Sequence, residues 1–212
     1  MLTLPLQNVK VRTRPQTGKI FFTSADLLHF PEWPKGPLIE LLNGELYMVP
    51  SPSIRHQRIS SEIHYQIKDF LKNKNLGEVI PAPVDVVLTD EDTVVPDIVY
   101  VSNSKRELIG ENNIHGAPDL AIEIVSTNRR HDYVEKKELY EHYAVNEYWV
   151  VDPYELKVSV FVLNQEKKYG APAGYDFNEE IPVISISGLS IRLSGLVETL
   201  KSPKVQPDES IE

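Results

Sequence analysis

The sequence predicts an α/β (α+β) fold, with a central mixed β-sheet flanked by helices and a hairpin extension near the N-terminus. Short β-branched runs separated by turn signals recur along the chain. Between 119 and 151 a strand, a helix and a second strand follow one another, and a crossover of this kind joins parallel strands. With 212 residues, of which 41% are hydrophobic, the chain is long enough to bury a sizeable core.

The first half of the chain is expected to contain a hairpin followed by a long helix. Asn43-Gly44 lies between two apolar runs, so residues 38–49 should form a hairpin that turns at this pair. The Pro-Ser-Pro-Ser segment at 50–53 ends that pattern, and the apolar residues after it fall on one face of a helix over about 54–74. The other expected elements are a short helix from 24, strands at 79–88, 94–101, 120–125, 148–151 and 158–163, a loop at 102–118, and a helix at 132–144 opened by a capping box.

Three segments are expected along the chain: an irregular N-terminal arm over 1–20, a single domain over 21–200, and a flexible acidic tail over 201–212. The end of the chain, PKVQPDESIE, is polar, acidic and proline-containing, as disordered segments are. The sequence contains no internal repeat that would indicate a second domain.

Composition narrows the function before any motif is considered. The net charge of −9 argues against a protein that binds nucleic acid through a broad basic surface, although it permits a local basic groove. The absence of cysteine excludes disulfides, thiolate metal sites and a cysteine nucleophile, and we expect a cytoplasmic protein. No apolar stretch approaches the ~20 residues of a membrane span, so no membrane partner is expected. Without phosphate-binding glycine loops, nucleophile-elbow serines or clustered histidines, a nucleotide cofactor and kinase, esterase or zinc-hydrolase chemistry are disfavoured.

Two carboxylates lie inside segments that otherwise resemble buried strands. Asp97 is part of the run VVPDIVYV, and Glu123 is part of DLAIEIV. Burying an unpaired charge costs several kcal/mol, or shifts the pKa until the group is neutral. A bound metal ion would remove that cost, so both residues are candidate metal ligands.

Lys136 lies within the helix expected over 132–144. At ~100° per residue, a helical wheel places it in the middle of a face made of tyrosines and a leucine. Such a lysine either extends along its stem to solvent or pairs with a buried carboxylate. Because the N-terminal end of a helix disfavours a cation, a compensating anion is favoured, and Asp97 and Glu123 would supply it.

Two further residues have a structural explanation beside a functional one. His56 lies on the apolar face of the helix over 54–74, where a histidine is more often a hydrogen-bonded core residue than a ligand. It is kept as a secondary candidate. Glu45, beside the turn of the hairpin, is expected to be an ordinary exposed carboxylate.

Taken in order, these residues resemble the putative restriction endonuclease family of the PD-(D/E)XK nuclease superfamily. The resemblance rests on Pro96-Asp97, on the EIVS run that begins at Glu123, on Lys136 with Tyr140 four residues later, and on EYWVVDP at the end of the set. A Pro-Asp pair alone carries no information. The ordered set is specific, and the match spans roughly residues 38–197.

The resemblance implies a restriction-endonuclease-like fold and a DNA endonuclease that hydrolyses phosphodiester bonds with Mg²⁺, or with Mn²⁺ as a substitute. It implies that Asp97, Glu123 and the carbonyl of Ile124 bind the metal, and that Lys136 activates water or stabilises the transition state. This set also makes chemical sense, because Mg²⁺ prefers oxygen ligands and keeps several waters.

The chain departs from the superfamily at one position. The usual lysine lies two residues after the second acidic residue, and here that residue is Val125. Either Lys136 replaces it from the neighbouring helix or the site is inactive, and we favour replacement because a lysine among tyrosines would otherwise have little purpose. The residues expected to orient the carboxylates or the water are His56, Ser126 and Tyr140.

The sequence indicates less about substrate recognition than about the reaction, and neither a DNA target nor a biological role is predicted. The candidate phosphate contacts are Arg55, Arg58, Arg129 and Arg130. A solvated helix face explains them equally well. A homodimer is expected only by analogy with nucleases that cut both strands. Two other functions stay open: a catalytically silent nuclease-fold module that binds DNA or a protein, and a hydrolase of small phosphate esters.

Overall fold

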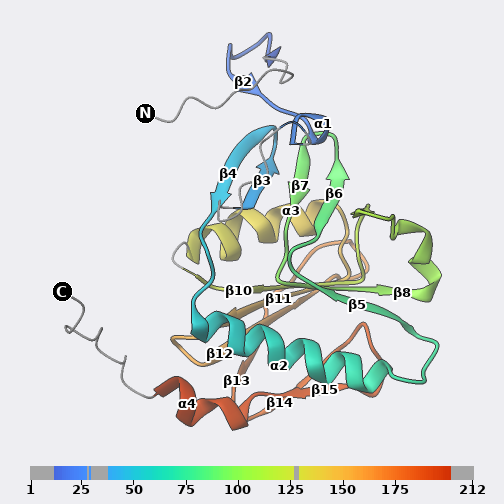
Figure 1. Cartoon of the computed structure of the whole chain (residues 1–212), viewed down its shortest axis with the longest axis vertical. Coiled ribbons are helices and arrows are strands. Elements are labelled where there is room, and N and C mark those ends of the chain that lie inside the picture. Colours follow the sequence, from blue (N-terminus) through green and yellow to red (C-terminus); the bar gives the residue numbers. More distant parts are fainter. Residues whose placement is uncertain (1–11, 28, 30–37, 127–128, 202–212) are drawn as a thin grey trace, which may run out of the picture.

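The computed structural model describes residues 12–27, 29, 38–126 and 129–201, and it confirms the predicted α+β class (Figure 1). The helices are α1 (Ser24–Leu27), α2 (Ile54–Leu71), η1 (Asn103–Leu108), η2 (His131–Lys136), α3 (Lys137–His142), η3 (Ser194–Leu196) and α4 (Val197–Lys201). The strands are β1 (Arg12–Thr13), β2 (Ile20–Phe21), β3 (Leu38–Leu42), β4 (Glu45–Val49), β5 (Gly77–Pro81), β6 (Asp85–Thr89), β7 (Asp92–Val94), β8 (Ile98–Ser102), β9 (Asn113–His115), β10 (Leu120–Ile124), β11 (Glu147–Asp152), β12 (Lys157–Val162), β13 (Ala173–Asp176), β14 (Glu180–Pro182) and β15 (Ser190–Arg192). Within these ranges, no helix has the length and apolar character needed to span a membrane.

The larger of two mixed sheets has six strands in the order β13-β12-β11-β10-β8-β5. β10 runs parallel to β11, and the other neighbouring strands pair antiparallel. The parallel pair is joined by η2 and α3, so the crossover predicted between 119 and 151 is confirmed.

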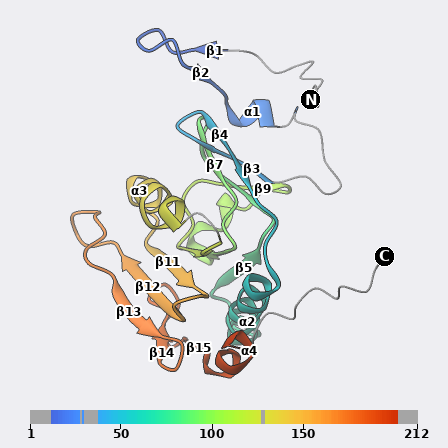
Figure 2. The same cartoon turned by 90° about the vertical axis from the view of Figure 1, so that its left-hand side faces the viewer.

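The two faces of the six-stranded sheet are covered differently, as Figures 1 and 2 show from two sides. One face is covered by α2 together with β14, β15 and α4, and the other face is covered by α3 and the smaller sheet. Because side chains alternate along a strand, β10 directs Leu120, Ile122 and Ile124 toward α2. The intervening residues, including Glu123, therefore face α3 and the smaller sheet.

The smaller sheet has the order β4-β3-β7-β6-β9 and contains the predicted hairpin. β3 pairs with β4 up to Leu42 and Glu45, with Asn43 and Gly44 between them. Both turn residues have positive φ, 50° and 75°, as a two-residue turn of this type requires. A Cβ on Gly44 would also come within 2.8 Å of the Phe21 side chain, so glycine is needed there for space as well.

Several predicted boundaries are wrong, and proline explains two of them. The single strand expected over 79–88 is two strands, β5 and β6, in different sheets, because Pro81 and Pro83 interrupt the ladder between them. The strand expected over 94–101 is likewise divided at Pro96 into β7 and β8. The loop expected over 102–118 contains η1 and β9, and the elements after 163 were not predicted.

The terminal segments are only partly within the described residues. In the arm predicted as irregular over 1–20, the described part forms a small hairpin in which β1 pairs with β2. The rest of that arm, residues 1–11, and residues 202–212 of the predicted tail lie outside the described part of the chain. The predicted domain limits stay predictions.

The helix predicted over 132–144 also begins differently. Residues 129 and 130 are already helical, and the helix continues as the π-helix η2 and then as α3. The predicted capping box is wrong, because Arg130 already has helical backbone angles and Asp132 lies inside η2 rather than before it.

Candidate active site

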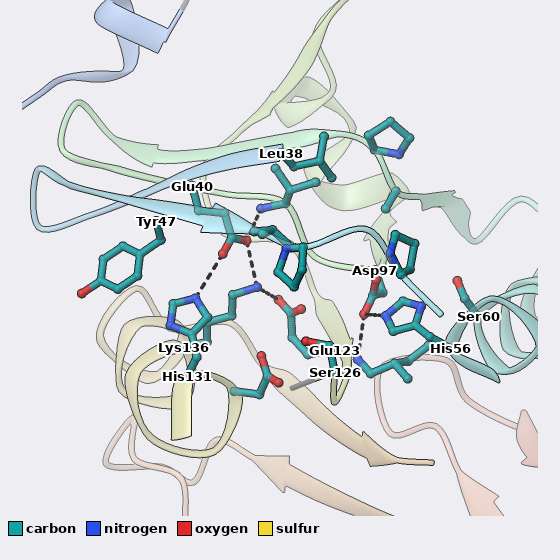
Figure 3. Close-up of a pocket in the computed structure, with 18 of the residues that line it drawn as sticks. Leu38, Glu40, Tyr47, His56, Ser60, Asp97, Glu123, Ser126, His131 and Lys136 are labelled. Carbon is teal, nitrogen blue, oxygen red and sulfur yellow. Dashed lines mark hydrogen bonds and ion pairs between the residues drawn. The ribbon is translucent and has the colours of Figure 1, made fainter. Parts of the chain in front are cut away.

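Of the two acidic residues predicted as metal ligands, Asp97 directly precedes β8, and Glu123 lies in β10, the neighbouring antiparallel strand. β8 and β10 pair in register as far as Ile98 and Ile122. Continuing that register by one residue brings Asp97 opposite Glu123. The structure therefore brings this predicted pair together, and both line the cavity drawn in Figure 3.

Asp97 is held by groups from two elements. The amide of Ile124 donates a hydrogen bond to Oδ2 of Asp97 at 2.7 Å. Nε2 of His56 lies 3.0 Å from the same oxygen. His56 is in the first turn of α2, where its amide donates to the hydroxyl of the capping residue Ser53. This geometry fits the predicted role of His56 as a residue that orients a carboxylate.

Lys136 lies between two carboxylates. Its Nζ is 2.8 Å from Oε1 of Glu40 and 2.9 Å from Oε1 of Glu123, and the residue is only 3% exposed. Tyr140, one turn further on, donates its hydroxyl to the same oxygen of Glu123 at 2.8 Å. The lysine is therefore paired inside the protein rather than extended to solvent. Asp97, the other partner proposed for it, is not in contact with its ammonium group.

Glu40, on β3 of the smaller sheet, was missed in the sequence. It is fully buried, it accepts a hydrogen bond from the amide of Val95 at 2.8 Å, and Nε2 of His131 lies 3.1 Å from its Oε2. A usable signal was present, because Glu40 interrupts the apolar run LIELL in the same way as Glu123 interrupts LAIEI.

His131 was missed because the helix was expected to begin at 132, which left this residue outside it. In an α-helix, residues five apart point about 140° away from each other. The i→i+5 hydrogen bonds of the π-helix η2 widen the turn, so His131 and Lys136 both reach Glu40 (Figure 3). Single π turns within helices are frequent at functional sites.

Glu40, Glu123, His131 and Lys136 form a charged cluster, and the charges in it change the pKa values of its members. Burial alone would raise the pKa of Glu40, but the charge of Lys136 and the hydrogen bonds from His131, Lys136 and Val95 lower it to about 2. Burial alone would lower the pKa of Lys136, but Glu123 and Glu40 raise it above its ordinary value. The ammonium group is thus held in its charged form.

Glu123 is shifted in the opposite direction from Glu40. Burial raises its pKa well above the usual value, Lys136 opposes that shift, and the nearby charges of Asp97, Glu40 and Asp132 add to it. Crowded carboxylates of this kind are stabilised in their charged form when a cation binds among them.

The cluster opens into a cavity of about 310 Å³. The polar residues that line it are Glu40, His56, Gln57, Ser60, Asp97, Glu123, Ser126, His131, Asp132 and Lys136. The rest of its wall is largely apolar and comes from β3, β4 and the proline-rich segments beside α2 and β5.

A family model described as "Uma2: Putative restriction endonuclease" matches residues 25–194. The chain belongs to this family. Among solved structures it is similar to a putative nuclease from Anabaena variabilis, with a TM-score of 0.69 and 22% identity over 84% of this chain and 99% of that one. At this identity the likeness shows the fold. No curated protein matches the chain.

The structure shows where an ammonium group comes from in this Uma2 protein, in which Val125 occupies the usual position of the lysine. Val125 is 1% exposed and belongs to the apolar cluster between the sheet and α3. The ammonium group that reaches Glu123 comes instead from Lys136, on the crossover helix. This placement agrees with the alternative in which Lys136 replaces the usual lysine, and the activity of the site stays a prediction.

The residues predicted to bind a metal fit a hard divalent cation. The hydrogen bonds and the ion pair described above use Oδ2 of Asp97 and Oε1 of Glu123, which leaves Oδ1 and Oε2 for another ligand. In the described ranges, no three histidine or acidic side chains are grouped closely enough to hold a metal ion by themselves. A cation that takes one or two carboxylates and keeps several waters is compatible with both facts, and Mg²⁺ behaves in this way.

The four arginines predicted to contact DNA differ in what their side chains do. The guanidinium of Arg55 donates to the carbonyls of Pro153 and Leu200, at 2.9 and 2.5 Å. Arg129 pairs with Asp152 at 2.5 Å. Arg130 lies 3.6 Å from Glu135 with its side chain 78% exposed, and Arg58 is exposed on α2. Their contacts with nucleic acid stay predictions.

Proposed function

We propose that this Uma2 protein is a divalent-cation-dependent DNA endonuclease, with Mg²⁺ as the cation and Mn²⁺ as its substitute. The family is a nuclease family, which supports hydrolysis of nucleic acid. The observation that carries the finer proposal is the convergence of Asp97, Glu123 and the buried ammonium of Lys136 on one cavity. The proposal includes a homodimer and a cytoplasmic location, as expected from the sequence.

In this proposal Asp97, Glu123 and the carbonyl of Ile124 hold the cation. When bound, it supplies Lewis-acid activation of a water molecule and of the scissile phosphate. His56 and Tyr140 each fix one oxygen of a carboxylate, and the other oxygen would be available to a cation. The new bond joins the water oxygen to phosphorus, and the bond from phosphorus to the leaving sugar oxygen breaks.

Lys136 acts in this proposal as a fixed positive charge rather than as a base. A base must be neutral to accept a proton, and its carboxylate neighbours hold Lys136 in the charged form. A cation held in place before the reaction stabilises the negative charge that develops on the phosphate in the transition state. Glu40 and His131 maintain this arrangement from the opposite side.

The experiment that tests this function is a titration of Mg²⁺ and Mn²⁺ with plasmid and oligonucleotide DNA, carried out on the parent protein, Asp97→Asn and Glu123→Gln. Cation-dependent cleavage should occur with the parent and fall by about 10²–10³-fold or more in both variants, because each removes a negatively charged ligand of the cation that stabilises the transition state. Glu45→Gln, which removes an exposed carboxylate on β4, is the matched control and should cleave normally.

Three results would contradict the proposal. Cleavage that survives both substitutions would come from a contaminant or another site. DNA binding without cleavage would favour a catalytically silent module. Hydrolysis of small phosphate esters but not of DNA would favour the third function, which the limited size of the cavity also permits.

A further inference from the structure

Asp132 is a buried acidic residue of the cavity to which the proposed function gives no role. It is 7% exposed and lines the cavity together with Asp97 and Glu123. Those two residues and Glu40 all have hydrogen-bond or ion-pair partners. In the part of the chain that the structure describes, the carboxylate of Asp132 has neither, which sets it apart from the other acids of the cavity.

The position of Asp132 is built into the fold. It lies in η2 between His131 and Lys136, both of which contact Glu40. The hydroxyl of Tyr148, a buried residue of β11, donates to the backbone carbonyl of Asp132 at 2.9 Å. The helix therefore holds this residue at the cavity, whereas the predicted capping role would have turned its side chain to the backbone amides.

A carboxylate in this setting is unfavourable for the fold on its own. Burial and the charges of Asp97 and Glu40 raise the pKa of Asp132 to about 6, although Lys136 and His131 act in the opposite direction. Buried acids usually offset the loss of water with hydrogen bonds or an ion pair. Since Asp132 has neither among the described residues, a ligand in the cavity is the natural compensation.

We propose that Asp132 is a third acidic residue of the cation site, and that it acts through the water molecules that the cation retains. This inference rests on the proposed function. No three acidic or histidine side chains of the described ranges are grouped to bind an ion directly, so a role across water suits the geometry. Mg²⁺ keeps several waters when it is bound by one or two carboxylates, and a buried carboxylate is a strong acceptor for their protons.

The test measures cation binding without DNA. Mn²⁺ is titrated calorimetrically into the parent protein, Asp132→Asn and Asp92→Asn, and the thermal stability of each metal-free protein is measured in parallel. Asp92 is a matched control, because it is 4% exposed but accepts hydrogen bonds from Asn43, Thr89 and Tyr143 outside this cavity.

The two substitutions should have opposite effects. Asp132→Asn should weaken Mn²⁺ binding by about 10–100-fold, as outer residues of metal sites do, and leave the metal-free midpoint of thermal unfolding unchanged or higher. Asp92→Asn should lower that midpoint and leave the affinity unchanged. An unaltered affinity in Asp132→Asn would overturn the inference. A weaker affinity accompanied by a loss of metal-free stability as large as that of Asp92→Asn would overturn it as well, because it would assign the residue to the fold.

The same data separate this inference from the proposed function. If the parent binds Mn²⁺, Asp97→Asn abolishes binding and Asp132→Asn does not weaken it, only the role of Asp132 fails. If the parent binds no Mn²⁺, the cation-dependent function fails and the role of Asp132 fails with it. If Mn²⁺ binds as expected but DNA is not cleaved, the role of Asp132 stands and the nuclease proposal falls.

Discussion

The two faces of the six-stranded sheet have opposite compositions. Toward α2, the packed side chains are apolar, and Ile59, Ile63 and Ile67 are fully buried. Toward α3 and the smaller sheet, the apolar cluster adjoins a group of charged residues that are almost as inaccessible, among them Glu123 and Lys136. The same strands supply both faces, since alternate residues of β10 belong to one or the other.

This difference in composition suggests that one face contributes mainly to stability and the other mainly to chemistry. Burial of an aliphatic side chain stabilises a fold by roughly 1.5–3 kcal/mol. A buried ion pair contributes little or nothing relative to apolar residues of the same shape, although removal of one partner is strongly destabilising. The α2 face is therefore expected to hold the molecule together, while the charges of the α3 face are explained by what they do to a ligand.

The largest effect expected from this comparison is produced by substituting one residue on each face. Lys136→Met should lower the cleavage rate of folded protein by about 10²–10³-fold, because it removes a preorganised charge. Ile63→Ala should leave that rate unchanged but lower the free energy of unfolding by about 2–5 kcal/mol. Cleavage per folded molecule and urea unfolding curves measure the two quantities.

Lys137→Met is the control for the first substitution, because the adjacent lysine lies near the Phe161 ring, outside the cavity. Lys136→Met leaves two buried carboxylates without their cation, so it should also be destabilised, by about 3–5 kcal/mol. The rate is therefore compared at a temperature at which circular dichroism shows each variant to be folded. Equal losses of cleavage in Ile63→Ala and Lys136→Met would remove the distinction between the faces.

A second, smaller effect is expected in the acid stability of the charged face. The pKa of Glu40 is lowered to about 2 from its ordinary value of 4.5, so the folded protein keeps this group ionised at pH values at which it would be protonated in the unfolded chain. Its contribution is present above about pH 4.5 and is lost as the pH falls toward 2. Glu40→Gln should therefore flatten the fall in the free energy of unfolding over this window, measured by urea unfolding at a series of pH values. An acid dependence as steep as that of the parent would show that Lys136 and His131 do not act on Glu40 as the geometry indicates, and Glu45→Gln is the exposed control.

The sequence identified part of this site because burial of a charge is visible in a strand. Asp97, Glu123 and Lys136 were found from their apolar neighbours. Glu40 has the same kind of neighbours but belongs to another sheet, and strand-level patterns do not reveal which sheets pack together. His131 and Asp132 were missed for a different reason, because the helix was expected to begin with a capping box at Asp132, whereas both residues lie inside the π-helix η2.

The strand boundaries were predicted wrongly where the local hydrophobic pattern conflicts with the pairing of strands in the sheets. Hydrophobicity continues through 79–88, and the break at Pro81 and Pro83 is visible only if the missing amide donors are weighed against it. The crossover from β10 to β11 was predicted correctly because its strand, helix and strand each have a strong local pattern, and its handedness and parallel pairing follow from general chain geometry.

The smallest expected effect concerns DNA contacts and extends the comparison to the arginines of α2. Arg58→Ala should weaken DNA binding modestly and make the fall of log affinity with log salt less steep by about 1. An exposed arginine that contacts one phosphate releases about one counterion, and the variant loses that contact. Arg55→Ala should instead destabilise the fold by about 1–3 kcal/mol and leave the salt slope unchanged, because its guanidinium is occupied by the carbonyls of Pro153 and Leu200. Fluorescence anisotropy of a labelled duplex over a series of salt concentrations measures the slope. The opposite result, a changed slope in Arg55→Ala and an unchanged one in Arg58→Ala, would contradict this assignment. It would mean that Arg55 leaves its two carbonyls to contact DNA, and that Arg58 is part of a solvated helix face.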